Sequence, residues 1–169
     1  FPLDFFQNAE LARAAWMAAL GLVLMAGIFP FHTWVPMLAE KAHPYAAGFI
    51  FIILPWMVTL FGLGLLDRYA WLRTNPGLPV LLQRAGLLMS VTAGIWMAFE
   101  RHLGRIMGYA VLAEMGFAIL ALGLPAGLSI YAVMILPRVL AFGVWALALS
   151  LIRQKYPQMH YRYIQGAAR

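Results

Sequence analysis

Two ionisable residues lie deep inside long apolar stretches of this sequence, and a histidine lies between two prolines at the end of another. Glu114 follows the run "RIMGYAVLA", and Arg138 directly follows Pro137. His32 stands within "GIFPFHTWVP". A carboxylate and a guanidinium can form an ion pair, while a carboxylate or an imidazole can also bind and release protons. These residue types therefore indicate charge pairing or proton transfer.

The composition indicates that the helices carrying these residues lie in a membrane and not in water. Of 169 residues, 64% are hydrophobic and 11% are charged, and there is no cysteine. A soluble domain is about half apolar and about one quarter charged. The absence of cysteine excludes a disulfide framework and a thiolate metal site. Successive apolar stretches of about 20 residues, each long enough to cross the hydrocarbon core, predict an all-α membrane protein.

Five transmembrane helices are predicted, over residues 9–29, 44–66, 80–99, 105–124 and 128–152. Polar connectors separate them, among them "HTWVPMLAEKAHP" and "ERHLG". We divide the chain into a transmembrane domain, residues 1–155, and a basic tail, residues 156–169. Because it opens on Phe1 and shows no signal peptide, we expect the chain to be part of a longer product.

The positive charges predict an orientation. The face reached after the first, third and fifth spans collects Lys41, Arg101, Arg105, Arg153, Lys155, Arg162 and Arg169. The opposite face has Arg13, Arg68, Arg73 and Arg84. By the positive-inside rule, the more basic face and the tail are cytoplasmic. Topology and anionic lipid then account for the net charge of +6, and nothing favours nucleic acid as a partner.

The two prolines beside His32 predict an interrupted helix. Pro30 and Pro36 each lack a backbone donor and tend to end a helix at the preceding residue. Within lipid, such a break is tolerated only where protein or a water-filled cavity surrounds it. Broken helices with polar atoms beside them form ion sites in transporters. The alternative is that this segment is simply the interfacial end of the first span, with Trp34 in the aromatic belt.

The same stretch resembles a known family. "FPFHTWVP" followed by "AEKAHPYAAGF" is similar to the signature of the antiporter-like membrane subunits of respiratory complex I and their Mrp-type and hydrogenase-linked relatives. A second run, "RIMGYAVLAEMGFAILALG", is similar to a later helix of that family. The resemblance implies about fourteen helices with two inverted repeats, of which this chain would supply the middle, and a chain of ionisable residues across the membrane centre.

The family's charged positions are only partly kept. The resemblance places lysines where this chain has Met25 and Trp56, and a histidine near Ile50. Neither methionine nor tryptophan can carry a proton. Arg138 falls near a position where many members have lysine, but arginine holds its proton and cannot relay it as lysine can.

Glu114 and Arg138 are predicted to lie at similar depth on adjacent helices, which favours a buried ion pair, either as a structural tie or as part of a proton path. Glu40 and Lys41 are further proton-path candidates beside His32. For Glu40, Lys41 and His43 we favour an ordinary solvated loop. The small residues of "YAAG" and "AGLLMSVTAG" indicate close helix packing.

These observations predict a membrane subunit of a complex I-like NADH/quinone oxidoreductase that takes part in proton translocation in a bacterial plasma membrane. Its partners would be other membrane subunits and lipid. No cofactor is expected in this chain, because quinone, flavin and iron-sulfur clusters would belong to partner subunits. "LAFGVWAL" favours the quinone-proximal member of the family. Two alternatives remain: a scaffold subunit that has lost proton transport, and a subunit of a cation/proton antiporter.

Overall fold

Helices make up nearly all of the structure. The computed structural model describes residues 2–69, 74, 76–157 and 159–164. The helices are α1 (Pro2–Ala26), the 3-10 helix η1 (Phe31–Thr33), α2 (Trp34–Lys41), α3 (Pro44–Arg68), α5 (Gly77–Phe99), α6 (Leu103–Leu122), α7 (Gly127–Lys155) and α8 (Tyr161–Ile164). The described residues hold no strand beyond one isolated bridge, between His102 and His160. The predicted all-α fold is confirmed.

Four helices, α3, α5, α6 and α7, are each long and apolar enough to cross a membrane. A fifth span exists if residues Arg13–Ala26 and Phe31–Lys41, which meet at an angle of 49°, are counted as one broken helix. The prediction of about five spans with a broken first helix is therefore confirmed. Arg73 and residues 165–169, which the prediction placed in a connector and in the tail, lie outside the described residues.

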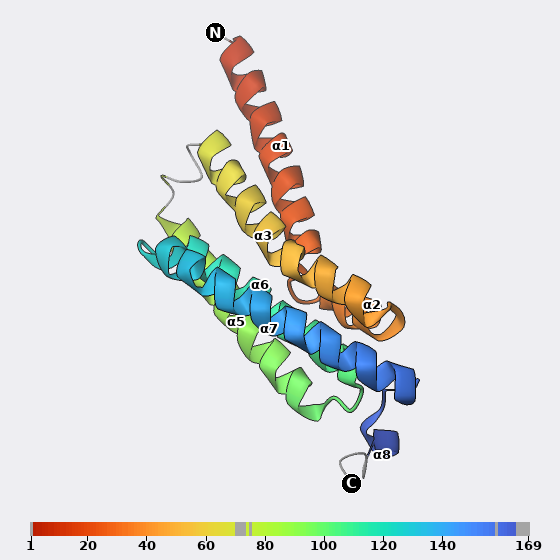
Figure 1. Cartoon of the computed structure of the whole chain (residues 1–169). Coiled ribbons are helices and arrows are strands. Elements are labelled where there is room, and N and C mark those ends of the chain that lie inside the picture. Colours follow the sequence, from red (N-terminus) through yellow and green to blue (C-terminus); the bar gives the residue numbers. More distant parts are fainter. Residues whose placement is uncertain (1, 70–73, 75, 158, 165–169) are drawn as a thin grey trace.

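Helix α6 is the centre of the bundle. Half of its most apolar 18-residue window is buried, against 17% in α5 and α7 and 28% in α3. It lies against α2, α3, α5 and α7 (Figure 1). Its buried side chains, including Val111, Leu112 and Met115, form one core with Val35 of α2 and Phe51 of α3. Because α6 has neighbours on several sides, a charged side chain on it is expected to face another helix.

Glycines allow α6 to approach its neighbours closely. A Cβ atom at Gly108 would lie 2.7 Å from the Cα of Pro36, and one at Gly116 would lie 2.8 Å from the backbone of Ser90. At Gly48, it would lie 2.5 Å from the Cβ of Ala146 on α7. Gly48 and Ser90 belong to the two small-residue runs, so their predicted role in close packing is confirmed.

The break after α1 is made by Gly27. This residue has a φ of +63°, which glycine adopts without steric cost. The N–H of Ile28 donates to the carbonyl of Val23, and the N–H of Gly27 donates to that of Leu24. This is the Schellman pattern of a helix end. The indole N–H of Trp34 also donates to the Leu24 carbonyl, at 3.2 Å.

Two predictions about this segment are wrong. Pro36 does not end a helix, because it lies in the first turn of α2, where a backbone N–H has no partner within the helix. "HTWVPMLAEKAHP" is not a polar connector either. Most of it forms η1 and α2, and α2 buries Val35, Pro36 and Ala39. The first span therefore continues beyond residue 29 as the second half of the broken helix.

The segment after α7 returns to the α5–α6 connector. The N–H of Leu103 donates to the carbonyl of Met159, and the N–H of Tyr161 donates to that of Arg101. Arg153 near the end of α7 donates to the carbonyl of Ala42, at 2.6 Å. The C-terminal ends of α2 and α7 and the N-terminal end of α6 therefore gather at one end of the bundle (Figure 1).

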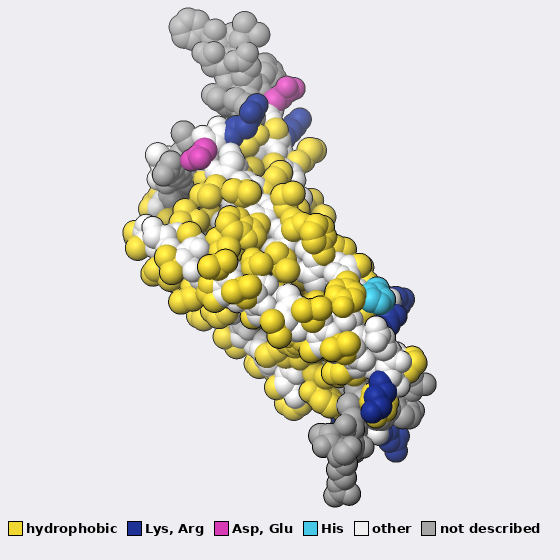
Figure 2. Space-filling view, in the orientation of Figure 1, with side chains coloured by type: hydrophobic (Ala, Val, Ile, Leu, Met, Phe, Trp, Pro, Cys, Tyr) yellow, Lys and Arg dark blue, Asp and Glu magenta, His cyan; other side chains and the backbone are white. Residues whose placement is uncertain are grey.

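Apolar side chains cover most of the visible outer surface, and charged side chains lie towards its two ends (Figure 2). Many large apolar side chains are more than 60% exposed, among them Trp16, Met17, Leu81, Phe99, Val133, Leu136 and Leu151. A surface this apolar is expected where acyl chains or neighbouring membrane helices replace water. The apolar helices and their exposed faces indicate a multi-pass membrane protein.

The close contact between α2 and α6 yields a stability prediction. We expect Gly108→Val to lower the unfolding free energy by about 1–3 kcal/mol, as overpacking does, because its side chain would meet the backbone of Pro36. The measurement is unfolding of the purified chain in mixed micelles. The control is Gly94→Val on α5, where a Cβ atom meets nothing within 4 Å. Equal losses in both variants would contradict a close α2–α6 contact.

Candidate functional site

Glu114 and Arg138 form an ion pair between α6 and α7. The Nε of Arg138 lies 2.9 Å from Oε2 of Glu114, and the two side chains are 25% and 19% exposed respectively. The predicted pairing is therefore confirmed. The local sequence explains how Arg138 comes to this position. It follows Pro137 within α7, and a proline inside a helix removes one backbone hydrogen bond and bends the helix.

Aromatic rings hold the guanidinium of Arg138 from two helices. Its Cζ lies 4.9 Å from the ring centroid of Tyr131 on α7 and 5.8 Å from that of Phe117 on α6. Both distances are in the range of a cation–π interaction. One guanidinium nitrogen, Nη1, is buried and has no hydrogen-bond partner. The guanidinium is thus held by one carboxylate and two aromatic rings, and its Nη1 donor remains unused.

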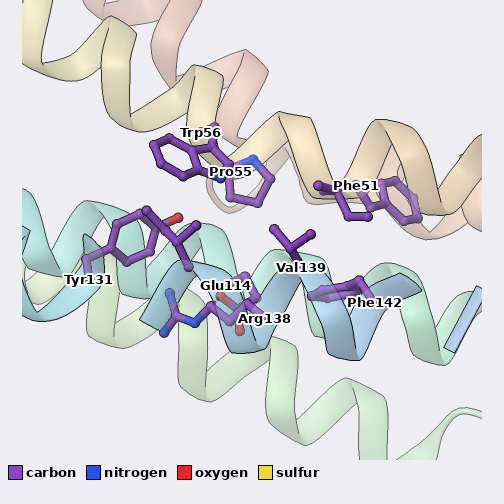
Figure 3. Close-up of a pocket in the computed structure, with 10 residues that line it drawn as sticks. Phe51, Pro55, Trp56, Glu114, Tyr131, Arg138, Val139 and Phe142 are labelled. Atoms are coloured by element: carbon purple, nitrogen blue, oxygen red, sulfur yellow. Dashed lines mark ion pairs between the residues drawn. The ribbon is translucent and has the colours of Figure 1, made fainter. Parts of the chain in front are cut away.

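A small cavity adjoins the pair. Its volume is about 20 Å³, and its lining includes both members of the pair together with Phe51, Pro55, Trp56, Tyr131 and Phe142 (Figure 3). A cavity of this size has room for about one water molecule if two or more polar groups face it. Pro55 has no backbone N–H and so removes one hydrogen bond from α3, the third helix that lines this cavity.

Sequence reasoning missed two buried polar residues beside this cavity. Tyr131 is 6% exposed and Thr59 of α3 is 5% exposed. The Tyr131 hydroxyl faces both Thr59 and Arg138, while the Thr59 hydroxyl donates to the carbonyl of Pro55, at 2.8 Å. A signal for Tyr131 was present, because it precedes Arg138 by seven residues and so lies on the same face of the helix.

A second charged cluster lies at the end of the bundle where α2 and α6 meet. Glu40 accepts a hydrogen bond from Nε of Arg105 at 2.7 Å, and Glu100 lies 3.7 Å from Nη1 of the same arginine. The interpretation of Glu40 as part of a solvated loop is therefore wrong: α2 is helical and turns Glu40 towards α6. Lys41 is exposed at the end of α2, and His43 is the residue before α3.

His32 joins neither cluster. It lies in η1, its ring stacks on Phe29 with centroids 5.6 Å apart, and its Nδ1 is buried without a hydrogen-bond partner. With Met89 and Thr92 of α5 and Leu112 of α6, it lines a separate cavity of about 10 Å³. The structure thus brings together Glu114 with Arg138, and Glu40 with Arg105, but not His32 with either pair.

The two positions where the resemblance expects lysine have different surroundings. Met25 packs against the apolar core. Trp56 lines the cavity beside Glu114 and Arg138. The cavity therefore has its cation on α7, at Arg138, and an aromatic ring on α3 at the expected lysine position. Among the described residues, no three His, Asp, Glu or Cys side chains are grouped to hold a metal ion.

Comparison with curated proteins shows what the chain is similar to. It is 30% identical to formate hydrogenlyase subunit 3 of Escherichia coli over 120 residues, which cover 69% of this chain and 19% of that protein. F(420)H(2) dehydrogenase subunit M of Methanosarcina mazei is 31% identical over 122 residues, with 69% and 24% covered. NAD(P)H-quinone oxidoreductase chain 4 2 of Synechococcus sp. (strain JA-3-3Ab) is 28% identical over 132 residues, with 73% and 22% covered.

The chain spans about a fifth of the length of these curated relatives. No family model and no solved structure matches it.

The pair between Glu114 and Arg138 yields a stability prediction. Arg138→Met leaves a partly buried carboxylate without its partner, so we expect a loss of about 1–3 kcal/mol in unfolding free energy. Adding Glu114→Gln removes the stranded charge and should restore most of that loss. Chemical unfolding in mixed micelles measures both. The exposed residues of α1 supply the matched controls, Arg13→Met and Glu10→Gln. Additive losses in the double variant would contradict the pairing.

His102 yields a pH prediction. Burial lowers the pKa of His102 below its ordinary value of 6.5, against the opposing charge of Glu40. The unfolded chain then binds more protons than the folded chain below pH 6.5, so stability falls as the pH falls from 6.5 through the lowered pKa. We expect His102→Gln to flatten this part of the profile, measured by unfolding at pH 5 to 8. An unchanged profile would contradict this assignment.

Proposed function

The chain belongs to the antiporter-like membrane subunits of complex I-type and hydrogenase-type assemblies, and we propose that it takes part in proton translocation coupled to quinone reduction. The assembly would be a complex I-like NADH/quinone oxidoreductase. Three relatives support this proposal by their printed names, which are NAD(P)H-quinone oxidoreductase chain 4 2, F(420)H(2) dehydrogenase subunit M and hydrogenase-4 component B.

The ion pair of Glu114 and Arg138 carries the proposal. A charged group inside a membrane helix is costly, and such residues are commonly functional. In this site Arg138 supplies a fixed positive charge, because a guanidinium keeps its proton at any accessible pH. Glu114 is the member that can bind and release a proton. Each such event breaks or restores the attraction between α6 and α7, and the proline beside Arg138 gives α7 a point at which to respond.

Partner subunits complete the proposed activity. Quinone, flavin and iron-sulfur clusters would be bound by other subunits, because this site offers one carboxylate and one guanidinium and a cavity of about 20 Å³. We place the protein in a bacterial plasma membrane with the tail in the cytoplasm. The gathering of Arg105, Arg153 and Glu40 at the tail end of the bundle is consistent with a cytoplasmic face there.

A scaffold role is the second candidate, and Met25 and Trp56 favour it. At these two positions the family resemblance expects lysine, and the structure gives them apolar surroundings or an aromatic lining role. In that case, the pair of Glu114 and Arg138 would hold α6 to α7 and nothing more. The two candidates differ in whether Glu114 changes its protonation state during turnover.

Replacing Glu114 tests the proposal. In inside-out membrane vesicles that contain the assembled complex, we expect Glu114→Gln to reduce proton uptake per NADH oxidised by more than about half, because the site loses its titratable group. A pH-sensitive dye follows uptake while the absorbance of NADH follows electron transfer. Glu10→Gln on the exposed face of α1 is the control and should leave the ratio unchanged.

The other outcomes separate the candidates. Normal assembly with an unchanged uptake ratio in Glu114→Gln would contradict a transport role for this residue and favour the scaffold. Failure of the complex to assemble would favour the structural tie. Proton movement that requires Na⁺ or K⁺ and no electron donor would instead favour a cation/proton antiporter.

A further inference from the structure

Tyr131 is the polar residue of the site that the proposed function leaves without a role. Its ring lies under the guanidinium of Arg138, and its hydroxyl faces Thr59 on α3. In Figure 3 the hydroxyl points away from α7 towards the part of α3 that carries Pro55 and Trp56. Tyr131 therefore contacts the cation of the site with its ring and a different helix with its hydroxyl.

We propose that Tyr131 is a positioning residue that couples the place of α3 to the protonation of Glu114, by holding Arg138 through its ring and Thr59 through its hydroxyl. The inference rests on the proposed function only in taking Glu114 as the group that binds the proton.

The ring face fixes the cation. Arg138 is paired through Nε with the carboxylate of Glu114, and its Nη1 has no hydrogen-bond partner. The rings of Tyr131 and Phe117 supply the remaining attraction. Because a cation–π interaction depends on where the ring lies, a shift of the Tyr131 ring moves the preferred place of the guanidinium. The distance from the guanidinium to Glu114, and with it the attraction that favours the carboxylate, changes accordingly.

The hydroxyl connects this ring to the part of α3 near Pro55. Thr59 is buried and its own hydrogen is used on the Pro55 carbonyl, so it can offer Tyr131 an acceptor oxygen. Thr59 lies one turn beyond Pro55. Because Pro55 has no backbone N–H to donate, α3 lacks one hydrogen bond at this proline and can bend there. Bending of α3 at Pro55 would therefore displace the Tyr131 ring, and the displacement would reach Glu114 through Arg138.

The charged and polar groups that face the site come from α3, α5 and α7. Among the described residues, Arg138 of α7 is the ionisable group whose charge acts on Glu114, and Tyr131 of the same helix lies beside it with a neutral hydroxyl. From α3 the site receives Thr59, and from α5 the hydroxyl of Ser90, which donates to the carbonyls of Gly86 and Ala113. Tyr131 and Arg138 therefore form a polar route from α3 to Glu114, beside the apolar α3 side chains that line the same cavity.

The test is an infrared titration of the assembled complex in membranes. The carbonyl band of protonated Glu114 is assigned by its loss in Glu114→Gln. We expect Tyr131→Phe, which keeps the ring and removes the hydroxyl, to move the midpoint of this band to higher pH by about 0.5 unit, or about threefold in the protonation equilibrium. Thr59→Val should produce the same shift, and the double variant should add nothing to either.

Two matched variants serve as controls. Thr92→Val on α5 removes another hydroxyl that donates to the carbonyl four residues before it, and Tyr45→Phe removes an exposed hydroxyl of α3. Neither should move the midpoint.

Three results would overturn the inference: unmoved midpoints in both Tyr131→Phe and Thr59→Val, additive shifts in the double variant, or no titrating Glu114 band at all. The proton-uptake assay distinguishes a failure of this inference from a failure of the proposed function. Coupled shifts with normal uptake in Glu114→Gln would end the transport proposal alone. Lost uptake in Glu114→Gln with unmoved midpoints would end this inference alone.

Discussion

The need to satisfy backbone polar groups within lipid governs this structure. A helix that stops at membrane depth leaves carbonyls that no water can reach, and each must find a partner inside the protein. The end of α1 meets this need through the hydrogen bonds of Gly27 and Ile28, and through the indole of Trp34 on the Leu24 carbonyl. Because Trp34 also begins α2, the bond that completes the end of one half-helix fixes the start of the other.

From this constraint the position of the charged site follows step by step. The half-helix α2 can lie in the bundle because Gly104 and Gly108 let it approach the backbone of α6. With α2, α3 and α5 packed around it, α6 leaves its remaining side to α7. Glu114 faces α7 across that contact, and Arg138 meets it there. Pro55 and Trp56 of α3 line the cavity beside the pair. The cavity beside the pair has a volume of about 20 Å³, which leaves room for about one water molecule.

The sequence predicted the parts that depend on length and type of residue. Apolar stretches of the right length predicted the spans, and the depth of Glu114 and Arg138 predicted their pairing. The sequence-based predictions failed for features that depend on the position of a residue within a helix turn or on its backbone dihedral angles. A proline breaks a helix only beyond the first turn, so Pro36 was misread, and the turn at Gly27 was overlooked because its positive φ leaves no composition signal. Thr59 and Tyr131 were missed because their contact joins two helices separated by three connectors.

The two ion pairs of α6 differ in what they can contribute. Arg105 and Glu114 are nine residues apart, which is about two and a half turns, so they point to opposite sides of the helix about 14 Å apart along its axis. Arg105 meets α2, and Glu114 meets α7. The pair with Glu40 is 41% and 31% exposed, and pairs of that exposure add little stability. Turning the helix away from α7 would nevertheless pull Arg105 from Glu40 as well as Glu114 from Arg138. The two pairs are therefore compatible with the same orientation of α6.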